Sequence, residues 1–86
     1  MPTIEIYTTS TCPYCMRAKA LLQNKGAGFK EINVNSQPGL RQKMMQRANG
    51  GYTVPQIFIN DEHIGGCDDL YALEHAGKLD EKLSAA

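Results

Sequence analysis

Cys12 and Cys15 are separated by Pro13 and Tyr14, and this spacing lets two thiols act on one disulfide. The pair follows a run of alternating apolar residues, typical of a strand, and opens a run with helical periodicity. A Cys-x-x-Cys pair beside a βαβ pattern is typical of a thiol–disulfide redox site. We therefore predict thiol–disulfide exchange at these two residues.

The position of Cys12 favours it as the nucleophile. Pro13 suits the first position inside a helix, because its missing N–H would be unpaired there anyway. Cys12 then occupies the cap position, where free backbone N–H groups and the positive end of the helix dipole both favour a thiolate. Cys15 lies one turn further, on the helix face of Ala18 and Leu22, and we expect it to be less exposed. We predict that Cys12 attacks a disulfide and that Cys15 resolves the intermediate.

The same two cysteines could also form half of a zinc site, which needs four ligands. Cys67, His63 and His75 are the residues available for the other half. Cys67 stands alone, however, and a Gly-Gly turn separates it from His63. We favour the redox site over structural zinc, and we expect both histidines to face solvent without a role.

The periodicity of apolar residues predicts the elements that position the cysteines. Strands are predicted over 3–8, 29–34 and 54–60, with a short fourth strand ending at residue 64, and helices over 14–25, 38–48 and 67–75. Residues 79–86 are predicted to form a weakly helical tail.

The predicted order of elements is β-α-β-α-β-β-α. A first βαβ unit gives two parallel strands with a right-handed crossover. The two-residue link at Asp61-Glu62 requires an antiparallel hairpin. We predict an α/β fold with a four-stranded mixed sheet flanked by three helices, in a single domain over residues 1–86.

Charge and composition argue against several classes of function. Nine basic and nine acidic residues give a net charge of zero, and no basic amphipathic helix is visible, so we expect neither nucleic acid nor a membrane as a partner. No apolar run approaches the roughly 20 residues of a membrane span. The first residues lack the features of a signal peptide. The odd number of cysteines, three, favours a reducing, cytoplasmic setting.

Three segments, in this order and spacing, resemble the dithiol glutaredoxins, most closely the small bacterial ones. They are Thr-Cys-Pro-Tyr-Cys at 11–15, Thr-Val-Pro-Gln-Ile-Phe at 53–58 and Gly-Gly-Cys-Asp-Asp-Leu at 65–70. The resemblance covers nearly the whole chain and implies a thioredoxin-like fold, which agrees with the predicted element order. It also implies a glutathione-dependent oxidoreductase. Such an enzyme reduces protein–glutathione mixed disulfides through Cys12 alone, and protein disulfides through Cys12 and Cys15.

The second segment contains a proline where a buried strand is predicted to begin, and proline cannot donate to a sheet ladder. In the family this proline, here Pro55, is cis and faces the active-site cysteines. The resemblance implies that Thr53, Val54 and Pro55 bind glutathione, with the backbone of Val54 pairing with its cysteinyl unit like an added strand. The alternative is that Pro55 merely starts the strand.

The third segment begins with two glycines, which let another backbone approach closely. The helix that follows offers free N–H groups to a carboxylate. The resemblance places the γ-glutamyl carboxylate of glutathione at Cys67 and Asp68, and its α-ammonium group at Asp68 or Asp69. Both aspartates also suit helix capping.

The family resemblance assigns two further contacts and exposes one departure. Gln42 lies where the family often holds the glycine carboxylate of glutathione, and Tyr14 resembles an aromatic wall beside the thiol; either could instead be an ordinary surface side chain.

Many glutaredoxins carry a lysine three residues before the nucleophile, where this chain has Thr9. The cations that could compensate are Arg17, Lys19 and Arg41.

The resemblance implies glutathione as co-substrate, no bound cofactor and a monomer. The expected partners are glutathione, glutathionylated and disulfide-containing proteins and, indirectly, glutathione reductase with NADPH.

Two other classes stay open. One is an iron–sulfur carrier in which two chains share a cluster through Cys12 and two glutathiones; Pro13 weighs against it, because cluster-binding relatives usually have a smaller residue there. The other is a thioredoxin-type carrier reduced by a flavoprotein reductase, which the Pro-Tyr dipeptide and the Cys67-Asp68 segment disfavour. For Cys67 itself, the alternatives are a buried small hydrophobe, a glutathionylated thiol or a link between two chains.

Overall fold

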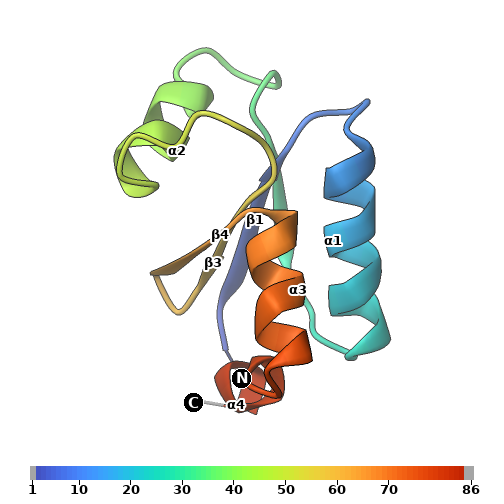
Figure 1. Cartoon of the computed structure of the whole chain (residues 1–86). Helices are drawn as coiled ribbons and strands as arrows, with labels where there is room; N and C mark the ends of the chain where they lie inside the picture. Colours follow the sequence, from blue (N-terminus) through green and yellow to red (C-terminus); the bar gives the residue numbers. More distant parts are fainter. Residues whose placement is uncertain (1, 85–86) are drawn as a thin grey trace.

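The computed structural model describes residues 2–84, in which the strands and helices follow the predicted order, with one further helix after them (Figure 1). The elements are β1 (Ile4–Thr8), α1 (Pro13–Asn24), β2 (Lys30–Asn33), α2 (Leu40–Arg47), β3 (Gln56–Ile59), β4 (Glu62–Gly65), α3 (Cys67–His75) and α4 (Leu79–Ser84). Within these residues four helices form. The prediction of three helices was wrong because it did not count α4. Helix α1 begins at Pro13, the first helical position predicted for that proline, one residue before the predicted range 14–25.

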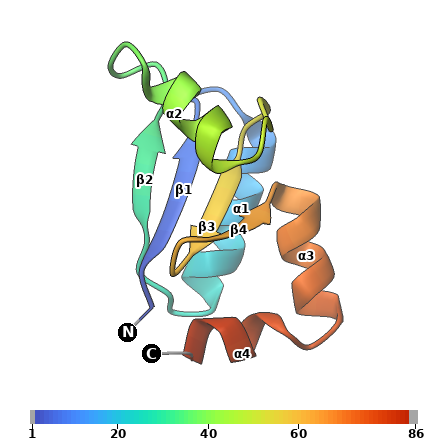
Figure 2. The same ribbon diagram turned by 90° about the vertical axis from the view of Figure 1, so that its left-hand side faces the viewer.

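The strands form the predicted mixed sheet, in the order β2-β1-β3-β4 (Figure 2). β1 and β2 are parallel, with Tyr7 opposite Ile32, and α1 makes the crossover between them. β1 and β3 are antiparallel, with Ile6 opposite Ile57, and β3 and β4 are also antiparallel. This is the mixed sheet that the element order predicts, and it agrees with the thioredoxin-like fold that the family resemblance implies.

The hairpin between β3 and β4 turns one residue earlier than predicted. Its two linking residues are Asn60 and Asp61, with φ values of 51° and 67°, and Glu62 already belongs to β4. A two-residue hairpin loop of this kind needs both residues in the left-handed region, which asparagine and aspartate tolerate better than glutamate does.

Helices cover both faces of the sheet: α1 and α3 lie on one face and α2 on the other (Figure 1). Neighbouring residues of a strand point to opposite faces, so Ile6 packs toward α1 and α3 while Tyr7 packs toward α2. The larger cluster includes Ile4, Ile6, Ala18, Leu21, Leu22, Ile57, Ile59, Leu70 and Leu79. The smaller one contains Tyr7, Val34, Met44, Ala48 and Phe58. Each fully buried large apolar side chain contributes about 1.5–3 kcal/mol, so both helix layers are held firmly on the sheet.

The predicted weak tail forms α4 because its first residue is anchored. Leu79 is completely buried in the larger cluster. Two ion pairs also join α4 to the rest of the chain: Lys25 Nζ lies 3.0 Å from Asp80 Oδ1, and Lys82 Nζ lies 2.9 Å from Glu62 Oε1. The last two residues of the predicted tail, 85–86, lie outside the described part of the chain. Among the helices described here, none has the length and apolarity required to span a bilayer.

Candidate active site

Cys12 caps the N-terminus of α1, as predicted. Its backbone is extended (φ −95°, ψ 109°), and Pro13 is the first helical residue. The backbone N–H of Cys15 donates a hydrogen bond to Cys12 Sγ over 3.2 Å. The same sulfur lies 3.6 Å from the carbonyl oxygen of Val54, to which its S–H can donate. A backbone donor aimed at the sulfur stabilises negative charge there, which suits a nucleophile.

Cys15 is buried, again as predicted, with only 1% of its surface exposed. Burial, together with the Cys12 sulfur beside it, raises the pKa of the Cys15 thiol to about 12, against a smaller lowering by the Thr9 backbone. Cys15 therefore stays protonated at neutral pH. Both cysteines are free thiols in the structure.

The segment that faces Cys12 precedes β3. Its Val54–Pro55 peptide bond is cis, as the family resemblance implies for this proline. The carbonyl of Val54 reaches Cys12, while Thr53 and Pro55 line an adjoining cleft. Pro55 itself is buried, and β3 begins at the next residue.

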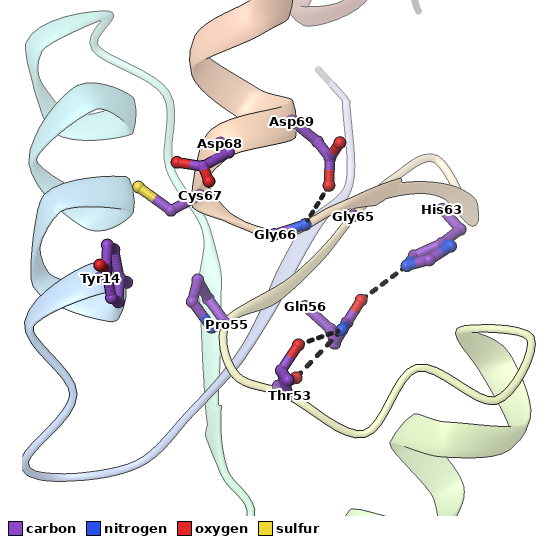
Figure 3. Close-up of a pocket in the computed structure, with 10 residues that line it drawn as sticks. All are labelled: Tyr14, Thr53, Pro55, Gln56, His63, Gly65, Gly66, Cys67, Asp68 and Asp69. Atoms are coloured by element: carbon purple, nitrogen blue, oxygen red, sulfur yellow. Dashed lines mark hydrogen bonds between the residues drawn. The ribbon is translucent and has the colours of Figure 1, made fainter.

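The cleft has a volume of about 420 Å³ and lies between the start of α1, the segment before β3 and the start of α3 (Figure 3). Six of the residues predicted to contact glutathione line it together: Tyr14, Thr53, Pro55, Cys67, Asp68 and Asp69. Val54 lies beside it, against Cys12. Gln42 does not join them; it lines a separate hollow beside α2, together with Arg41 and Pro38.

The two aspartates at the start of α3 differ in their contacts. Asp69 Oδ2 accepts a hydrogen bond of 2.9 Å from the backbone N–H of Gly66, which is a capping contact. Asp68 is exposed, and within residues 2–84 its carboxylate has no hydrogen bond or ion pair of its own. Gly65 has a φ of 116°, and a Cβ there would overlap the Asp69 carboxylate, so this turn requires glycine. Asp69 is therefore engaged as a cap, whereas Asp68 is available to a ligand.

Cys67 begins α3 and is buried, with 5% of its surface exposed. Burial raises the pKa of its thiol, so the thiol form is favoured. It packs with the larger apolar cluster and its side chain points toward α1 (Figure 3). This environment is that of a small buried hydrophobe rather than of an activated thiol.

The glutaredoxin family model matches residues 4–64, which is more than half of the chain. The chain belongs to the glutaredoxin family. A glutaredoxin from Pseudomonas aeruginosa is 59% identical over 85 residues, covering 99% of this chain and 100% of the relative. Glutaredoxin 3 of Escherichia coli is 55% identical over 83 residues, covering 96% and 99%.

Solved glutaredoxin structures have the same fold. The solution structure of glutaredoxin from Brucella melitensis is 58% identical and has a TM-score of 0.82, covering 94% of this chain and 87% of that one. The crystal structure of a buckwheat glutaredoxin–glutathione complex is 30% identical and has a TM-score of 0.89, covering 96% and 77%. Family membership makes this chain a thiol–disulfide oxidoreductase of the thioredoxin-like fold.

The departure at Thr9 leaves the glutaredoxin site without its common lysine. The three cations that could compensate all contact other groups. Lys19 Nζ lies 3.0 Å from Glu31 Oε2, Arg41 Nη1 donates to the Tyr52 carbonyl over 3.0 Å, and the Arg17 guanidinium lies over the Tyr71 ring. Among the described residues, the hydrogen bonds of Cys12 Sγ involve backbone groups: the Cys15 N–H donates to the sulfur, and the Val54 carbonyl can accept from its S–H.

Sequence reasoning missed two residues that line this cleft, Gln56 and His63. His63 was expected to face solvent, but it is half-buried and its Nε2 lies 2.7 Å from Gln56 Oε1. The sequence signal was Gln56 itself, a polar residue at the start of an otherwise apolar strand. The burial of His63 comes from its register opposite Phe58 in the β3–β4 pair, which periodicity alone does not specify. His75 is exposed, as expected.

Proposed function

We propose that this glutaredoxin is glutathione-dependent, with Cys12 as the attacking thiolate and Cys15 as the resolving thiol. One observation carries the proposal: the Cys12 sulfur accepts a helix N-terminal N–H beside a cleft, while Cys15, one turn further, is buried. The two thiols are thereby suited to different steps. The buckwheat relative that was crystallised with glutathione supports glutathione as the co-substrate.

In the monothiol route, the Cys12 thiolate attacks the glutathione sulfur of a protein–glutathione mixed disulfide. The Cys12–glutathione disulfide forms as the old disulfide breaks, and the protein leaves as a thiolate. A second glutathione thiolate then attacks the glutathione sulfur on Cys12. Oxidised glutathione leaves and the Cys12 thiolate is restored, so this route needs no second cysteine of the protein.

In the dithiol route, Cys12 attacks a protein disulfide and forms a mixed disulfide with one of its sulfurs. The Cys15 thiol then attacks Cys12 Sγ, and its proton passes to the released protein thiolate. The Cys12–Cys15 disulfide that remains is reduced by two glutathiones, which leave as oxidised glutathione. Electrons for both routes come from NADPH through glutathione reductase.

We propose that glutathione occupies the cleft beside Cys12. Its γ-glutamyl carboxylate would lie at the N–H groups that start α3, with its α-ammonium group against the available carboxylate of Asp68. The backbone of Val54 would pair with its cysteinyl unit, and Tyr14 would form the wall. Gln42 lines another hollow, so its contact with the glycine carboxylate stays a prediction from the family resemblance.

A coupled assay tests this function. The protein is mixed with a glutathionylated peptide, glutathione, glutathione reductase and NADPH, and NADPH oxidation is followed. We expect turnover that depends on glutathione. A protein that is inactive here, yet is reduced directly by a flavoprotein thioredoxin reductase, would instead be a thioredoxin-type carrier.

A further inference from the structure

A chain of hydrogen bonds links His63 on β4 to the segment that contacts Cys12 (Figure 3). His63 Nε2 lies 2.7 Å from Gln56 Oε1. Gln56 Nε2 in turn donates to the carbonyl oxygen of Thr53 at 3.0 Å and to its Oγ1 at 3.3 Å. Thr53 directly precedes Val54, whose carbonyl lies 3.6 Å from Cys12 Sγ.

The chemistry of the partners sets the direction of these bonds. The carbonyl oxygen of Thr53 can only accept, so the Gln56 side chain must present its NH₂ group there. Its Oε1 must then face His63 and needs a donor. The Nε2 atom of His63 therefore carries a hydrogen and donates to Gln56.

Packing leaves the Gln56 amide little freedom to adopt another orientation. Gln56 is buried, with 5% of its surface exposed. A Cβ at Gly51 would come within 3.1 Å of its Nε2, so the loop backbone closes over the amide. The His63 ring packs against the Phe58 ring, with centroids 5.1 Å apart, and this holds its Nε2 toward Gln56.

We propose that His63 is a positioning residue for the substrate segment 53–55. The His63 N–H holds the Gln56 amide in the orientation in which its NH₂ group donates to Thr53. Fixing Thr53 in turn places the neighbouring Val54 against Cys12. Segment 53–55 belongs to no strand of the sheet, so the Gln56 amide ties it to the sheet framework. This inference rests on the proposed function, because it assigns His63 to the docking of a glutathionylated substrate.

Removing the His63 donor would leave a buried amide oxygen unpaired, which is costly enough to reorient the side chain. Thr53 would then lose its hydrogen bonds with the Gln56 amide, and segment 53–55 would bind substrate less well. Because the segment holds the substrate before and during reaction alike, the change falls on KM rather than on kcat.

The first test compares His63→Phe, which keeps a ring against Phe58 but removes the donor, with His63→Gln, which supplies an amide donor. For a glutathionylated peptide we expect His63→Phe to raise KM about five-fold with kcat within about two-fold of wild type, the scale of one lost hydrogen bond. His63→Gln should recover most of that loss. His75→Phe, the same change at an exposed site, is the matched control and should behave as wild type.

The second test asks whether His63 acts through Gln56. Gln56→Leu removes both links, so adding His63→Phe to it should change KM no further. In addition, ¹⁵N NMR should show slow hydrogen exchange of the Gln56 side-chain amide in wild type and fast exchange in His63→Phe. If His63→Phe unfolds, His63→Leu takes its place with the same expectations.

A wild-type KM and a slowly exchanging Gln56 amide in the donor-free variant would overturn the proposal, and so would additive effects of the two substitutions. Failure of the proposed function is distinguishable, because the wild-type protein itself would then not turn over the glutathionylated peptide. The NMR readout would still report whether His63 holds Gln56.

Discussion

The backbone N–H of Cys15 donates to the sulfur of Cys12 over 3.2 Å, so the residue proposed to resolve the mixed disulfide also contacts the sulfur proposed to attack. The contact exists because Cys12 caps α1 and Pro13 starts it. The side chain of Cys15 meanwhile points into the core, where burial raises its pKa to about 12. One turn of helix thus separates a half-buried sulfur that accepts a backbone N–H from a buried thiol with a raised pKa.

Cys12→Ser should reduce the turnover of glutathionylated peptide to below roughly one-thousandth of wild type, because serine cannot form the mixed disulfide. Cys67→Ala is the matched control and should keep near-wild-type turnover, since Cys67 is buried and its thiol form is favoured. The coupled NADPH assay measures both. Activity that survives in Cys12→Ser and disappears in Cys67→Ala would transfer the nucleophile to Cys67.

The raised pKa of Cys15 predicts selective alkylation. A thiol with a pKa of about 12 stays protonated throughout the neutral range and is a poor nucleophile there. Brief treatment of the reduced, folded protein with iodoacetamide near neutral pH should therefore modify Cys12 and spare Cys15 and Cys67. Peptide mapping by mass spectrometry locates the label, and the denatured protein, in which all three cysteines should react, is the control. Equal labelling of Cys12 and Cys15 in the folded protein would contradict this difference.

Asp68→Lys should raise the KM for glutathionylated peptide by about five-fold, because a cation would replace the carboxylate proposed to face the α-ammonium group. The capping contact of Asp69 stays intact, so the fold should persist. Glu81→Lys makes the same charge reversal on α4 at an exposed residue that does not line this cleft, and should leave KM unchanged. Steady-state kinetics over a range of peptide concentrations decides between a ligand contact and a simple helix start.

The sequence predicts the fold well where local rules decide it. Alternation identifies β1, and the positions of Pro13 and Gly26, which has a φ of 69°, set both ends of α1. α4 was underestimated because its stability is tertiary: Leu79 is buried and two ion pairs reach it from Lys25 and Glu62. Such contacts join residues too far apart in the sequence for periodicity to reveal.

In the site, too, features set by local sequence could be predicted and features set by tertiary contacts could not. The cap position of Cys12 and the burial of Cys15 could be predicted, because both depend on one helix start. The link from His63 to Gln56 could not, because it depends on the register of β3 against β4. The hollow that contains Gln42 likewise depends on how α2 lies on the sheet, which sequence motifs do not encode.

The contacts of Arg47 predict that two substitutions in α2, Arg47→Met and Lys43→Met, differ in their effect on the free energy of unfolding. Its Nη2 lies 2.8 Å from Glu5 Oε1, its Nη1 donates to Tyr7 Oη over 3.0 Å, and its guanidinium lies 4.1 Å from the Phe58 ring centroid. Arg47→Met should lower the free energy of unfolding by about 2 kcal/mol, because it removes hydrogen bonds between charged, partly buried groups. Lys43→Met removes the same charge from the exposed side of α2 and should cost less than about 0.5 kcal/mol.

The effect of Arg47→Met should also depend on pH. Hydrogen bonding to Arg47 holds the pKa of Glu5 below its ordinary value of 4.5. A lowered pKa in the folded state contributes stability above the unfolded value, and that stability is lost as pH falls through the folded value. The difference between wild type and Arg47→Met should therefore be constant near neutral pH and shrink below about pH 4.5. Denaturant unfolding at several pH values measures it, and a difference that grows with acidity would contradict the assignment.

The most direct test of the two-cysteine account is a paired assay on Cys15→Ser. Deglutathionylation requires one thiolate and glutathione, so its rate should stay at or above that of wild type, because the side reaction that closes the Cys12–Cys15 disulfide is gone. Reduction of a protein disulfide should lose most of its rate, since the mixed disulfide on Cys12 then waits for glutathione, and intact mass spectrometry should find that adduct on Cys12. If both rates collapse together, or no adduct forms on Cys12, the proposed division between attacking and resolving cysteine is wrong.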